Sequence, residues 1–494
     1  MRDFQKSGQL PPLLQAQANR GPAALADGLA IFWAGVIAVT PDRLFAAQVR
    51  LERDCLVIDD QEFDLRGVRR VVVVGAGKAS AAMAQALFES CLAQLEGKLE
   101  VVGWINAPEG SFSTGQAGPI HLHAARPMGR NEPTEAAVMG TQEILRHMES
   151  CRDDDLCIVL LSGGGSALLT APVEGITLND KQQVARKLAA AGANIQQLNT
   201  VRRALSRVKG GGLIANCQAR EVISLIISDV LGDPLETIAS GPTVASAVAQ
   251  PSEALSILEE LGLITEPDLH NVVNNLQRRQ QRSHSDILSK NDTRSGVRRS
   301  QLLVTHIILG NNATAVDAAG VKAVELGYRY IMQSARALEG DVNQLAERFG
   351  HQLVQWSAEP QVDCWISGGE PTVKLPTTCG RGGRNQQLAC LTMLELVRRG
   401  WPDGASPSLS TPRIRETLLF LSAGTDGEDG PTPAAGAWFD RSTYGQLVAR
   451  GLDAADYAAR ADTFSLFSLL DSLIVSGPSG TNVCDLRIAL KVKP

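Results

Sequence analysis

The feature that most constrains the fold is a short apolar run followed at once by a glycine-rich segment, repeated along the chain. Residues 71–74 lead into Gly75-Ala-Gly-Lys78, and residues 157–161 lead into Ser162-Gly-Gly-Gly-Ser166. Apolar runs of this length and β-branched content are typical of buried parallel strands, and segments with helical spacing lie between them. The pattern predicts a layered α/β protein whose glycine-rich loops follow its strands.

A chain of 494 residues is too long for one hydrophobic core, so we expect more than one domain. The α/β pattern fills residues 1–275, breaks over residues 276–300, and restarts over residues 301–494 with a strand at residues 302–309. The break is polar and rich in basic residues; a linker or surface loop is the main interpretation and an anion-binding arm the alternative. We predict two α/β domains with a cleft between them, a common location for ligands.

Composition excludes several classes of partner. The formal net charge of −6 gives no electrostatic reason to expect binding to nucleic acid or to an acidic membrane. No stretch of about 18 apolar residues is present, and the first 20 residues lack the apolar core of a secretory signal. The nine cysteines form no Cys-x-x-Cys pair, which favours reduced thiols over disulfides or zinc. We therefore expect a cytoplasmic protein, with its oligomeric state open between monomer and homodimer.

The first glycine-rich loop lies where a phosphate-binding loop would lie, between a strand and a helix. It is not a Walker loop, because Val72 and Ala79 stand where glycine and Ser or Thr are needed. It is not a dinucleotide fingerprint either, because Ser80 replaces the third glycine and Asn106 stands near the expected ribose-binding acid.

The same loop can still receive an anion. Backbone N–H groups at Gly75 and Gly77 and the start of the next helix would point toward it, and Lys78 would add a positive charge. A lysine at a helix start opposes the helix dipole, which an anion would offset. A solvated lysine on a tight turn is the alternative interpretation.

The second loop offers close backbone approach. Its three glycines would let N–H groups surround a ligand, and the two serines would add hydroxyl contacts. The loop lacks the Gly-x-Ser-x-Gly order of a nucleophile elbow, so we do not predict a hydrolase. A flexible turn is the alternative. The residues concerned are Ser162, Gly163, Gly164, Gly165 and Ser166.

A basic segment follows. Residues 200–208 are predicted to form a helix that ends at a triple glycine, with Arg202, Ser206 and Lys209 on one face. The basic residues could bind a ligand, or they could stabilise the helix C-terminus. Both interpretations stay open.

Two aspartates each follow a predicted strand. Asp229 comes just after residues 222–227, and Asp426 comes after residues 417–422. A carboxylate in this position can help to hold Mg²⁺ or take a proton from a substrate hydroxyl. Each is also a common turn residue, which is the alternative.

Two arginines lie among glycines in Gly380-Arg-Gly-Gly-Arg-Asn385, after a strand predicted at residues 362–366. A guanidinium can bind phosphate through two N–H groups, so this segment is predicted to hold an anion. A further loop of glycines and hydroxyls, Ser476 to Asn482, lies near the end of the chain, where such loops usually fray. Glycine-rich loops recurring in this way indicate phosphate chemistry.

Taken in order, these motifs resemble the class II glycerate kinases (glycerate 2-kinases), from about residue 25 to the end. The order and spacing of the motifs carry the resemblance. They are Gly75-Ala-Gly-Lys-Ala79, Ser162-Gly-Gly-Gly-Ser-Ala-Leu168, Asn199-Thr-Val-Arg-Arg203, Lys209-Gly-Gly211, Ser228-Asp-Val-Leu-Gly-Asp233, Ser240-Gly-Pro-Thr243, Ser367-Gly-Gly-Glu-Pro-Thr372, Gly383-Arg-Asn-Gln386, Thr425-Asp-Gly-Glu-Asp-Gly430 and Gly477-Pro-Ser-Gly-Thr-Asn482.

The resemblance implies two three-layer α/β/α domains, the N-terminal one Rossmann-like. It also implies ATP-dependent phosphorylation of D-glycerate with Mg²⁺, usually at the 2-hydroxyl, which gives 2-phosphoglycerate. The family's leading catalytic candidates map to Lys78 and Arg384, and its aspartates map to Asp229 and Asp426, as bases or metal ligands. Ligand and nucleotide contacts are expected at Gly75, Gly77, Ser162, Gly163, Gly164, Gly165, Ser166 and Gly383.

The chain departs from the family pattern at three places, which puts the substrate preference in question. They are residues 129–134, Gly212 and Cys484. The alternatives to the kinase are an NAD(P)H-dependent hydroxypyruvate reductase and a non-catalytic anion or nucleotide sensor. The missing third glycine and missing ribose acid argue against the reductase.

Overall fold

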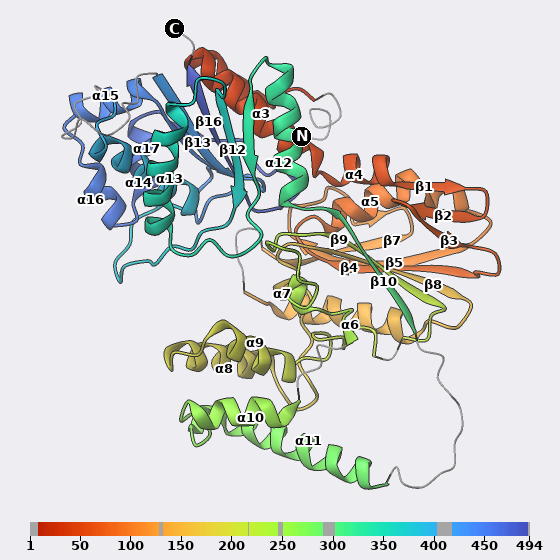
Figure 1. Ribbon diagram of the computed structural model, residues 1–494. Coiled ribbons are helices and arrows are strands. Elements are labelled where there is room, and N and C mark those ends of the chain that lie inside the picture. The colour runs from red at the N-terminus through yellow and green to blue at the C-terminus, as the bar shows by residue number, and fades with distance from the viewer. Residues whose placement is uncertain are drawn as a thin grey trace. The chain divides into compact units, whose positions relative to one another are not determined.

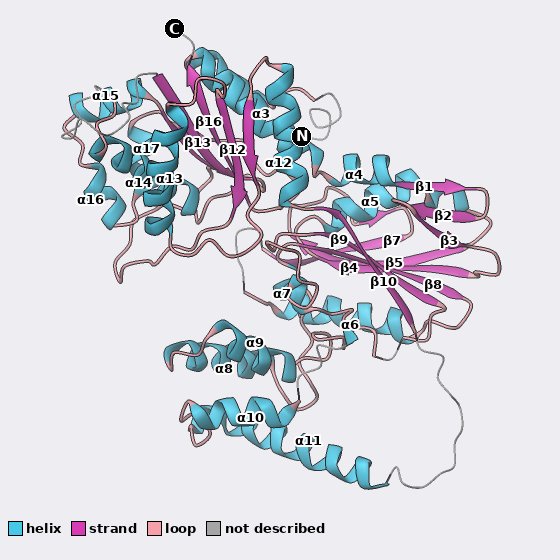
Figure 2. Cartoon of the chain, viewed as in Figure 1, coloured by secondary structure: helices cyan, strands magenta, loops and turns pink. Residues whose placement is uncertain are grey.

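The computed structural model describes residues 8–127, 132–215, 217–245, 250–289, 302–402 and 417–492. The chain divides into two compact units. Unit 1 comprises Met1–Ala47, Ile227–Asp233 and Gly310–Pro494, and unit 2 comprises Gln48–Ile226 and Pro234–Leu309. Each unit contains one large sheet with helices packed on it, so the predicted α/β class is confirmed (Figures 1 and 2).

The sheet of unit 2 has the order β10-β9-β8-β4-β5-β7-β6. The valines of β4 are completely buried, as their β-branched run predicts. Helices α5 (Ser80–Ser90) and α6 (Glu135–Glu149) cover opposite faces of the sheet (Figure 1). The strands are β4 (Arg70–Ala76), β5 (Glu100–Pro108), β6 (Gln116–Ala117), β7 (Ile120–Arg126), β8 (Asp155–Ser162), β9 (Glu221–Ile227) and β10 (Leu303–Gly310).

The strand order creates a topological switch point. β4 pairs in parallel with β5 on one side and with β8 on the other, so the chain leaves β4 toward one edge and later returns on the opposite side. Ligands of open α/β sheets bind outside the carboxyl ends of the strands at such a point. The loops that follow β4 and β8 are the first and second glycine-rich loops.

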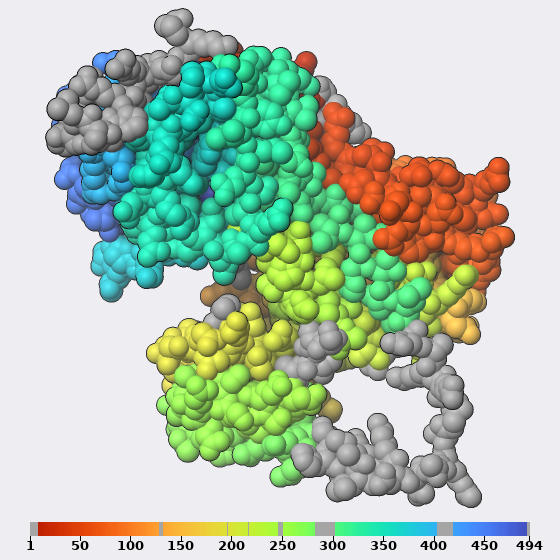
Figure 3. Space-filling model, in the orientation of Figure 1, coloured from red at the N-terminus to blue at the C-terminus, as the bar shows by residue number. Residues whose placement is uncertain are grey.

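Four helices of unit 2 form a group with its own apolar core: α8 (Leu178–Ala190), α9 (Ile195–Ala204), α10 (Pro251–Glu260) and α11 (His270–Ser289). In the space-filling view they are the closely packed yellow to light green group (Figure 3). α9 begins at Ile195 and ends at Ala204, earlier than the predicted 200–208. A capping box between Asn194 and Gln197 fixes its start. The remaining elements are β1 (Val49–Glu52), β2 (Cys55–Ile58), β3 (Gln61–Asp64), α7 (Gly165–Leu168), η1 (Leu92–Leu95), η2 (Ile238–Ser240) and η4 (Pro267–Leu269).

The sheet of unit 1 has the order β11-β12-β16-β13-β14-β15, with the last strand, β16, antiparallel to both neighbours. Helices α3 and α12 pack on one face and α13 and α14 on the other, which gives three layers (Figure 1). The strands are β11 (Tyr330–Gln333), β12 (Cys364–Gly369), β13 (Thr417–Gly424), β14 (Gly436–Phe439), β15 (Leu473–Ile474) and β16 (Asp485–Val492). The helices are α2 (Pro12–Arg20), α3 (Ala23–Ala38), α4 (Pro41–Gln48), α12 (Asn312–Glu325), α13 (Val342–Ser357), α14 (Arg384–Arg398), α15 (Arg441–Ala449), α16 (Ala454–Ala459) and α17 (Thr463–Leu469).

The structure corrects the predicted domain boundaries. Residues 1–47 belong to unit 1, because α3 packs on its sheet: a Cβ on Gly28 would lie 2.9 Å from Leu421, and one on Gly35 would lie 2.6 Å from Leu486. The strand predicted to restart the pattern is β10, which adds to the sheet of unit 2 beside β9. Local pattern predicts elements, but it does not identify their partners in the sheet.

The predicted linker at residues 276–300 is partly helical. Residues 276–289 complete α11, while residues 290–300 lie outside the described residues. All nine cysteines are free thiols, as expected. In the described parts of the chain, no single helix is long and apolar enough to cross a membrane; α3 and α4 pass that test only as a pair bent by 57°.

Candidate active site

In unit 2 the first two glycine-rich loops pack directly against each other. The backbone N–H of Lys78 donates to the carbonyl of Gly163 at 2.8 Å. A Cβ on Gly77 would lie 2.1 Å from Ser162 Oγ, so only glycine permits this approach. Part of the glycine content therefore serves the packing of the two loops, in addition to any ligand contact.

Ser162 has an internal role that differs from its predicted ligand contact. It is 1% exposed, and its hydroxyl accepts the N–H of Ala79 at 2.9 Å, just before α5. Ser166, at the other end of the loop, is exposed. Of the two serines, Ser166 is the one positioned to meet a ligand.

Two further motifs join the second loop. Lys209 Nζ donates to Ser166 O at 3.0 Å, to Ser240 Oγ at 3.0 Å, and to Ser166 Oγ. The N–H groups of Gly210 and Gly211 donate to the carbonyls of Ser240 and Gly241 at 3.0 and 2.7 Å. The structure thus brings together motifs that are far apart in sequence.

The predicted helical face of Arg202, Ser206 and Lys209 needs correction. α9 ends at Ala204, so Ser206 and Lys209 lie in the segment that follows it. Lys209 is 8% exposed, and burial, together with repulsion from Lys181 and Arg202, lowers its pKa well below the usual value. Arg202 and Lys209 remain close enough to interact although they do not share a helix.

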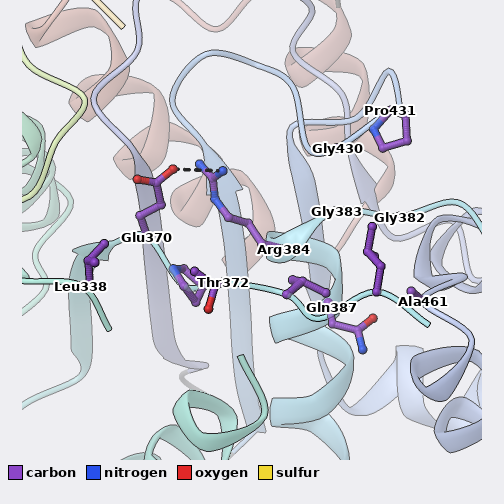
Figure 4. Close-up of a pocket in the computed structure, with 13 residues that line it drawn as sticks. Leu338, Glu370, Thr372, Gly382, Gly383, Arg384, Gln387, Gly430, Pro431 and Ala461 are labelled. Atoms are coloured by element: carbon purple, nitrogen blue, oxygen red, sulfur yellow. Dashed lines mark ion pairs between the residues drawn. The ribbon is translucent and has the colours of Figure 1, made fainter. Parts of the chain in front are cut away.

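In unit 1 Arg384 is the first residue of α14, and carboxylates hold its guanidinium in place. Nε and Nη2 donate to the two oxygens of Asp485 at 2.8 and 2.9 Å, and Nη1 pairs with Glu370 at 3.2 Å (Figure 4). Burial opposes the charge on Arg384, but attraction from Asp485 and Glu370 outweighs it, so the pKa of the guanidinium is raised. The arginine is fixed in orientation and remains 32% exposed.

Asp429 positions the start of the same helix. Its two carboxylate oxygens accept the backbone N–H groups of Asn385 and Gln386 at 3.0 and 2.8 Å. Asp429 is 2% exposed, and burial raises its pKa to about 7 despite these two hydrogen bonds. Gly383 is needed here because a Cβ would lie 2.3 Å from Asp429 Cγ.

The two predicted aspartates also lie in unit 1. Asp426 Oδ1 accepts the N–H of Glu428 at 3.1 Å, which forms the turn after β13. The Sγ of Cys484 donates to the carbonyl of Asp229 at 2.9 Å, and the charge of Asp229 contributes to the raised pKa of Glu370, whose main cause is burial. Asp229 is thus placed near the Arg384 carboxylates.

The terminal glycine loop is ordered, contrary to the expected fraying. Ser479 is buried, its N–H donates to Asp426 O at 3.1 Å, and its hydroxyl donates to Thr425 O at 2.6 Å. The loop therefore supports the turn that carries Asp426.

A pocket of about 550 Å³ opens beside Arg384 within unit 1. Figure 4 shows Glu370 and Arg384 joined by an ion pair on one side of the view, with Gly383, Gly430 and Pro431 toward the other side. Apolar side chains of Leu338, Val373 and Leu375 complete the lining. The volume is within the range of small-molecule sites, and the charged end of the pocket would orient a ligand.

The predicted site residues fall into two sets. Lys78 and the second loop lie in unit 2, whereas Gly383, Arg384, Asp229 and Asp426 lie in unit 1. The sequence analysis did not single out four residues that hold the predicted ones in place: Glu370 and Asp485 at Arg384, Asp429 at the start of α14, and Ser240 at Lys209. All four stand inside the quoted motifs or close to them, which was an available signal.

The described residues contain no group of three or more His, Cys, Asp or Glu side chains that could hold a metal ion. Mg²⁺ in phosphoryl-transfer sites is usually held by one or two carboxylates together with substrate phosphates. Single carboxylates such as Asp229 and Asp426 fit that requirement.

Comparison with known proteins identifies the family. Residues 27–276 match a family described as "Domain of unknown function (DUF4147)", and residues 363–485 match the MOFRL family. A glycerate kinase of Homo sapiens is 36% identical over 485 residues, covering 88% of this chain and 86% of the relative. A glycerate 2-kinase of Pyrococcus horikoshii is 31% identical over 472 residues, covering 94% and 96%. The crystal structure of glycerate kinase from Thermotoga maritima matches with a TM-score of 0.72 and 28% identity, covering 95% of this chain and 100% of that one. This chain therefore belongs to the glycerate kinase family and is an enzyme.

Proposed function

We propose that this enzyme uses ATP and Mg²⁺ to phosphorylate D-glycerate, giving 2-phosphoglycerate. The relatives named glycerate kinase and glycerate 2-kinase support the substrate and the position of the new phosphate. The observation that carries the proposal is the contact between the first two glycine-rich loops at the switch point of unit 2, with Lys78 beside them. Loops of this kind present N–H groups and positive charge to phosphate.

We assign Lys78 and Arg384 the role of holding the phosphoryl group and neutralising its charge during transfer. Phosphoryl transfer requires alignment and neutralisation of charge more than covalent help from the protein. Arg384 suits this role because Asp485 and Glu370 fix its guanidinium at the edge of a pocket. A preoriented cation loses little free energy to reorganisation when charge develops on the phosphoryl oxygens.

We assign two roles to Asp229 and Asp426 as a pair. One carboxylate takes the proton of the substrate hydroxyl, and the other helps to hold the metal ion. When bound, Mg²⁺ would neutralise charge on the phosphate oxygens. Each aspartate lies in a loop after a strand, where its carboxylate can take a proton or coordinate the ion.

The alternative, a hydroxypyruvate reductase that uses NAD(P)H, receives no support from the end of β5. Asn106 stands near the expected ribose-binding acid, is fully buried, and donates its amide to Leu168 O at 2.9 Å. A buried amide that is committed to the backbone cannot replace a carboxylate that holds a ribose. Oxidation of NADH by the purified enzyme with hydroxypyruvate would revive this alternative.

The direct test is phosphorus NMR of the products formed from ATP, Mg²⁺ and D-glycerate. A 2-phosphoglycerate signal is expected, and absence of any phosphoglycerate would refute the proposal. Lys78→Ala and Arg384→Ala should each lower kcat by about 10² or more, a loss of roughly 3 kcal/mol of transition-state stabilisation. Near-normal kcat in either variant would remove that residue from its assigned role.

Arg381→Ala is the matched control. Arg381 lies in the same glycine-rich segment, but its guanidinium stacks over the ring of Phe464 at 4.6 Å. This variant should keep near-normal turnover. A loss as large as that of Arg384→Ala would show that the segment acts through its overall charge or order.

A further inference from the structure

Unit 2 contains a cluster of three cations, Lys181, Arg202 and Lys209, that we call the cation cluster. Lys181 on α8 is 8% exposed, and its Nζ has no hydrogen-bond partner among the described residues. Arg202, on α9, acts electrostatically on both Lys181 and Lys209. Repulsion among buried like charges is costly unless a counter-charge is supplied.

Among the described residues that pack around α8, no carboxylate pairs with Lys181. The charged groups that pack around α8 are Arg202 and Arg203 on α9, Glu266 and Asp268 at η4, and His270, Arg278 and Arg279 on the described part of α11. Of these, only Arg202 acts on Lys181. Glu266 and Asp268 are paired with Lys187 at 2.8 and 3.3 Å, and the Asp180 carboxylate accepts the backbone N–H of the N-cap residue Thr177 at 2.8 Å.

Position on the helix adds a second anomaly. Lys181 lies in the first turns of α8, near the N-terminus, where the helix dipole disfavours a positive charge and favours a negative one. Arg202 lies in the last turn of α9, where the helix dipole favours a positive charge. This position alone would explain an arginine there. Helix stabilisation therefore explains Arg202 but not Lys181.

Hydroxyl groups adjoin the cluster. Ser166 Oγ and Ser240 Oγ are 2.9 Å apart, and both contact Lys209 Nζ. Ser166 is exposed, so solvent reaches the hydroxyl side of the cluster. Cations and hydroxyls together form the donor set that oxygen anions prefer.

We propose that Lys181, Arg202 and Lys209, with Ser166 and Ser240, form a subsite that binds an oxygen anion, either the carboxylate of the hydroxy acid or a phosphate of the nucleotide. This inference rests on the proposed function for the identity of its ligands. The bound anion supplies a negative partner for Lys181, whose Nζ has none among the described residues. The cluster is thus a positioning element for substrate, distinct in role from the Lys78 loop.

Proton uptake gives the subsite a measurable property. In the free enzyme burial, followed by repulsion from Arg202, lowers the pKa of Lys181 to about 8. An anion bound beside it favours the charged form and raises that pKa. Binding at pH 8 should therefore draw protons from the buffer, in part to Lys181 and in part to Lys209.

The test is isothermal titration calorimetry at pH 8 in two buffers of different ionisation enthalpy. D-glycerate, inorganic phosphate and ATP without metal are titrated separately into the wild-type enzyme and into Lys181→Met, which keeps side-chain length. We expect Lys181→Met to bind one of these anions at least about tenfold more weakly and to lose part of the proton uptake. Lys187→Met, on the same helix but paired with Glu266, is the control and should match the wild type.

The outcomes separate the sources of the anion. Weaker binding of D-glycerate alone assigns the subsite to the carboxylate, and weaker binding of phosphate and ATP alone assigns it to the nucleotide. Unchanged affinity and unchanged proton uptake for all three ligands would overturn the proposal. Arg202→Met is a second variant that decides the matter if Lys181→Met does not fold.

Failure of the subsite and failure of the proposed reaction give different results. If the wild type forms 2-phosphoglycerate but Lys181→Met binds every ligand normally, the subsite fails and the kinase assignment stands. If the wild type binds these anions through Lys181 but forms no phosphoglycerate, the kinase assignment fails and the subsite stands.

Discussion

The two units treat buried charge in opposite ways. In unit 1 Arg384 is surrounded by carboxylates, with Asp485 completely buried and bound to it through two hydrogen bonds. In unit 2 Lys181 and Lys209 are buried, and burial together with repulsion from Arg202 lowers the pKa of both. The charge of Arg384 is compensated by carboxylates, whereas Lys181 Nζ has no partner in the part of the chain that the structure describes.

This difference indicates what each site still requires. The carboxylates around Arg384 hold its guanidinium rigidly, and their excess negative charge suits the Mg²⁺ that we propose would accompany the phosphoryl group there. Buried cations that no carboxylate neutralises leave a positive environment, which suits an anionic ligand without a metal. Removal of the Arg384 charge should therefore destabilise the protein, whereas removal of the Lys181 charge should stabilise it.

The largest effect is expected for Arg384→Ala. Removal of the guanidinium leaves Asp485 buried without its partner, so the free energy of unfolding should fall by about 3 kcal/mol, at the low end because Arg384 is partly exposed. Urea denaturation followed by circular dichroism measures it. Arg384→Ala combined with Asp485→Asn should recover part of the loss; a single variant as stable as the wild type would contradict the comparison.

The glycines that permit close packing give the next largest effect. Gly77→Ala brings a Cβ to 2.1 Å from Ser162 Oγ, and Gly383→Ala brings one to 2.3 Å from Asp429 Cγ. Each should cost about 2 kcal/mol of unfolding free energy by overpacking. Gly115→Ala and Gly445→Ala, where a Cβ meets nothing within 4 Å, are the matched controls, and equal losses in the controls would refute the steric explanation.

The smallest effect, and the one of opposite sign, is expected for Lys181→Met. Replacing a buried, unpaired cation by an apolar side chain of similar length should raise the free energy of unfolding by about 1–2 kcal/mol at pH 7. Chemical denaturation at pH 7 tests this directly. A destabilised variant would show that the charge has a structural partner and would erase the contrast between the units.

The pH dependence of the same variant sharpens the result. The pKa of Lys181 is about 8 in the folded protein and near the ordinary lysine value of 10.5 in the unfolded chain. Between these values the unfolded chain binds more protons, so the stability of the wild type rises with pH. The advantage of Lys181→Met should shrink from pH 8 to pH 10.5, and a constant advantage would exclude Lys181 titration as the cause.

Much of the secondary structure was predictable because it is local. The valine run of β4 and the strand predicted at residues 417–422, which is β13 (Thr417–Gly424), lie near their predicted positions, because apolar period and breaking residues act over a few positions. The start of α9 was missed because a capping box at Asn194 competes with the apolar pattern.

The candidate site was predictable only in part. Lys78 and Arg384 stand in motifs with glycines, so their chemistry is visible in the sequence. The hydrogen bond from Arg384 to Asp485 links residues that are 101 positions apart in the sequence. The repulsion between Arg202 and Lys181 acts between residues of two different helices. No local pattern contains either relationship.

The amino-acid sequence by itself determined the α/β class, the glycine-rich loops and the kind of charge that each loop carries. Tertiary structure decided that residues 1–47 and β10 exchange their expected domains, that Ser162 faces inward, and that Lys181 is buried without a hydrogen-bond partner among the described residues. The reason is physical: backbone propensity and apolar period act over a few residues, whereas burial and electrostatic pairing depend on which distant segments the sheet brings together.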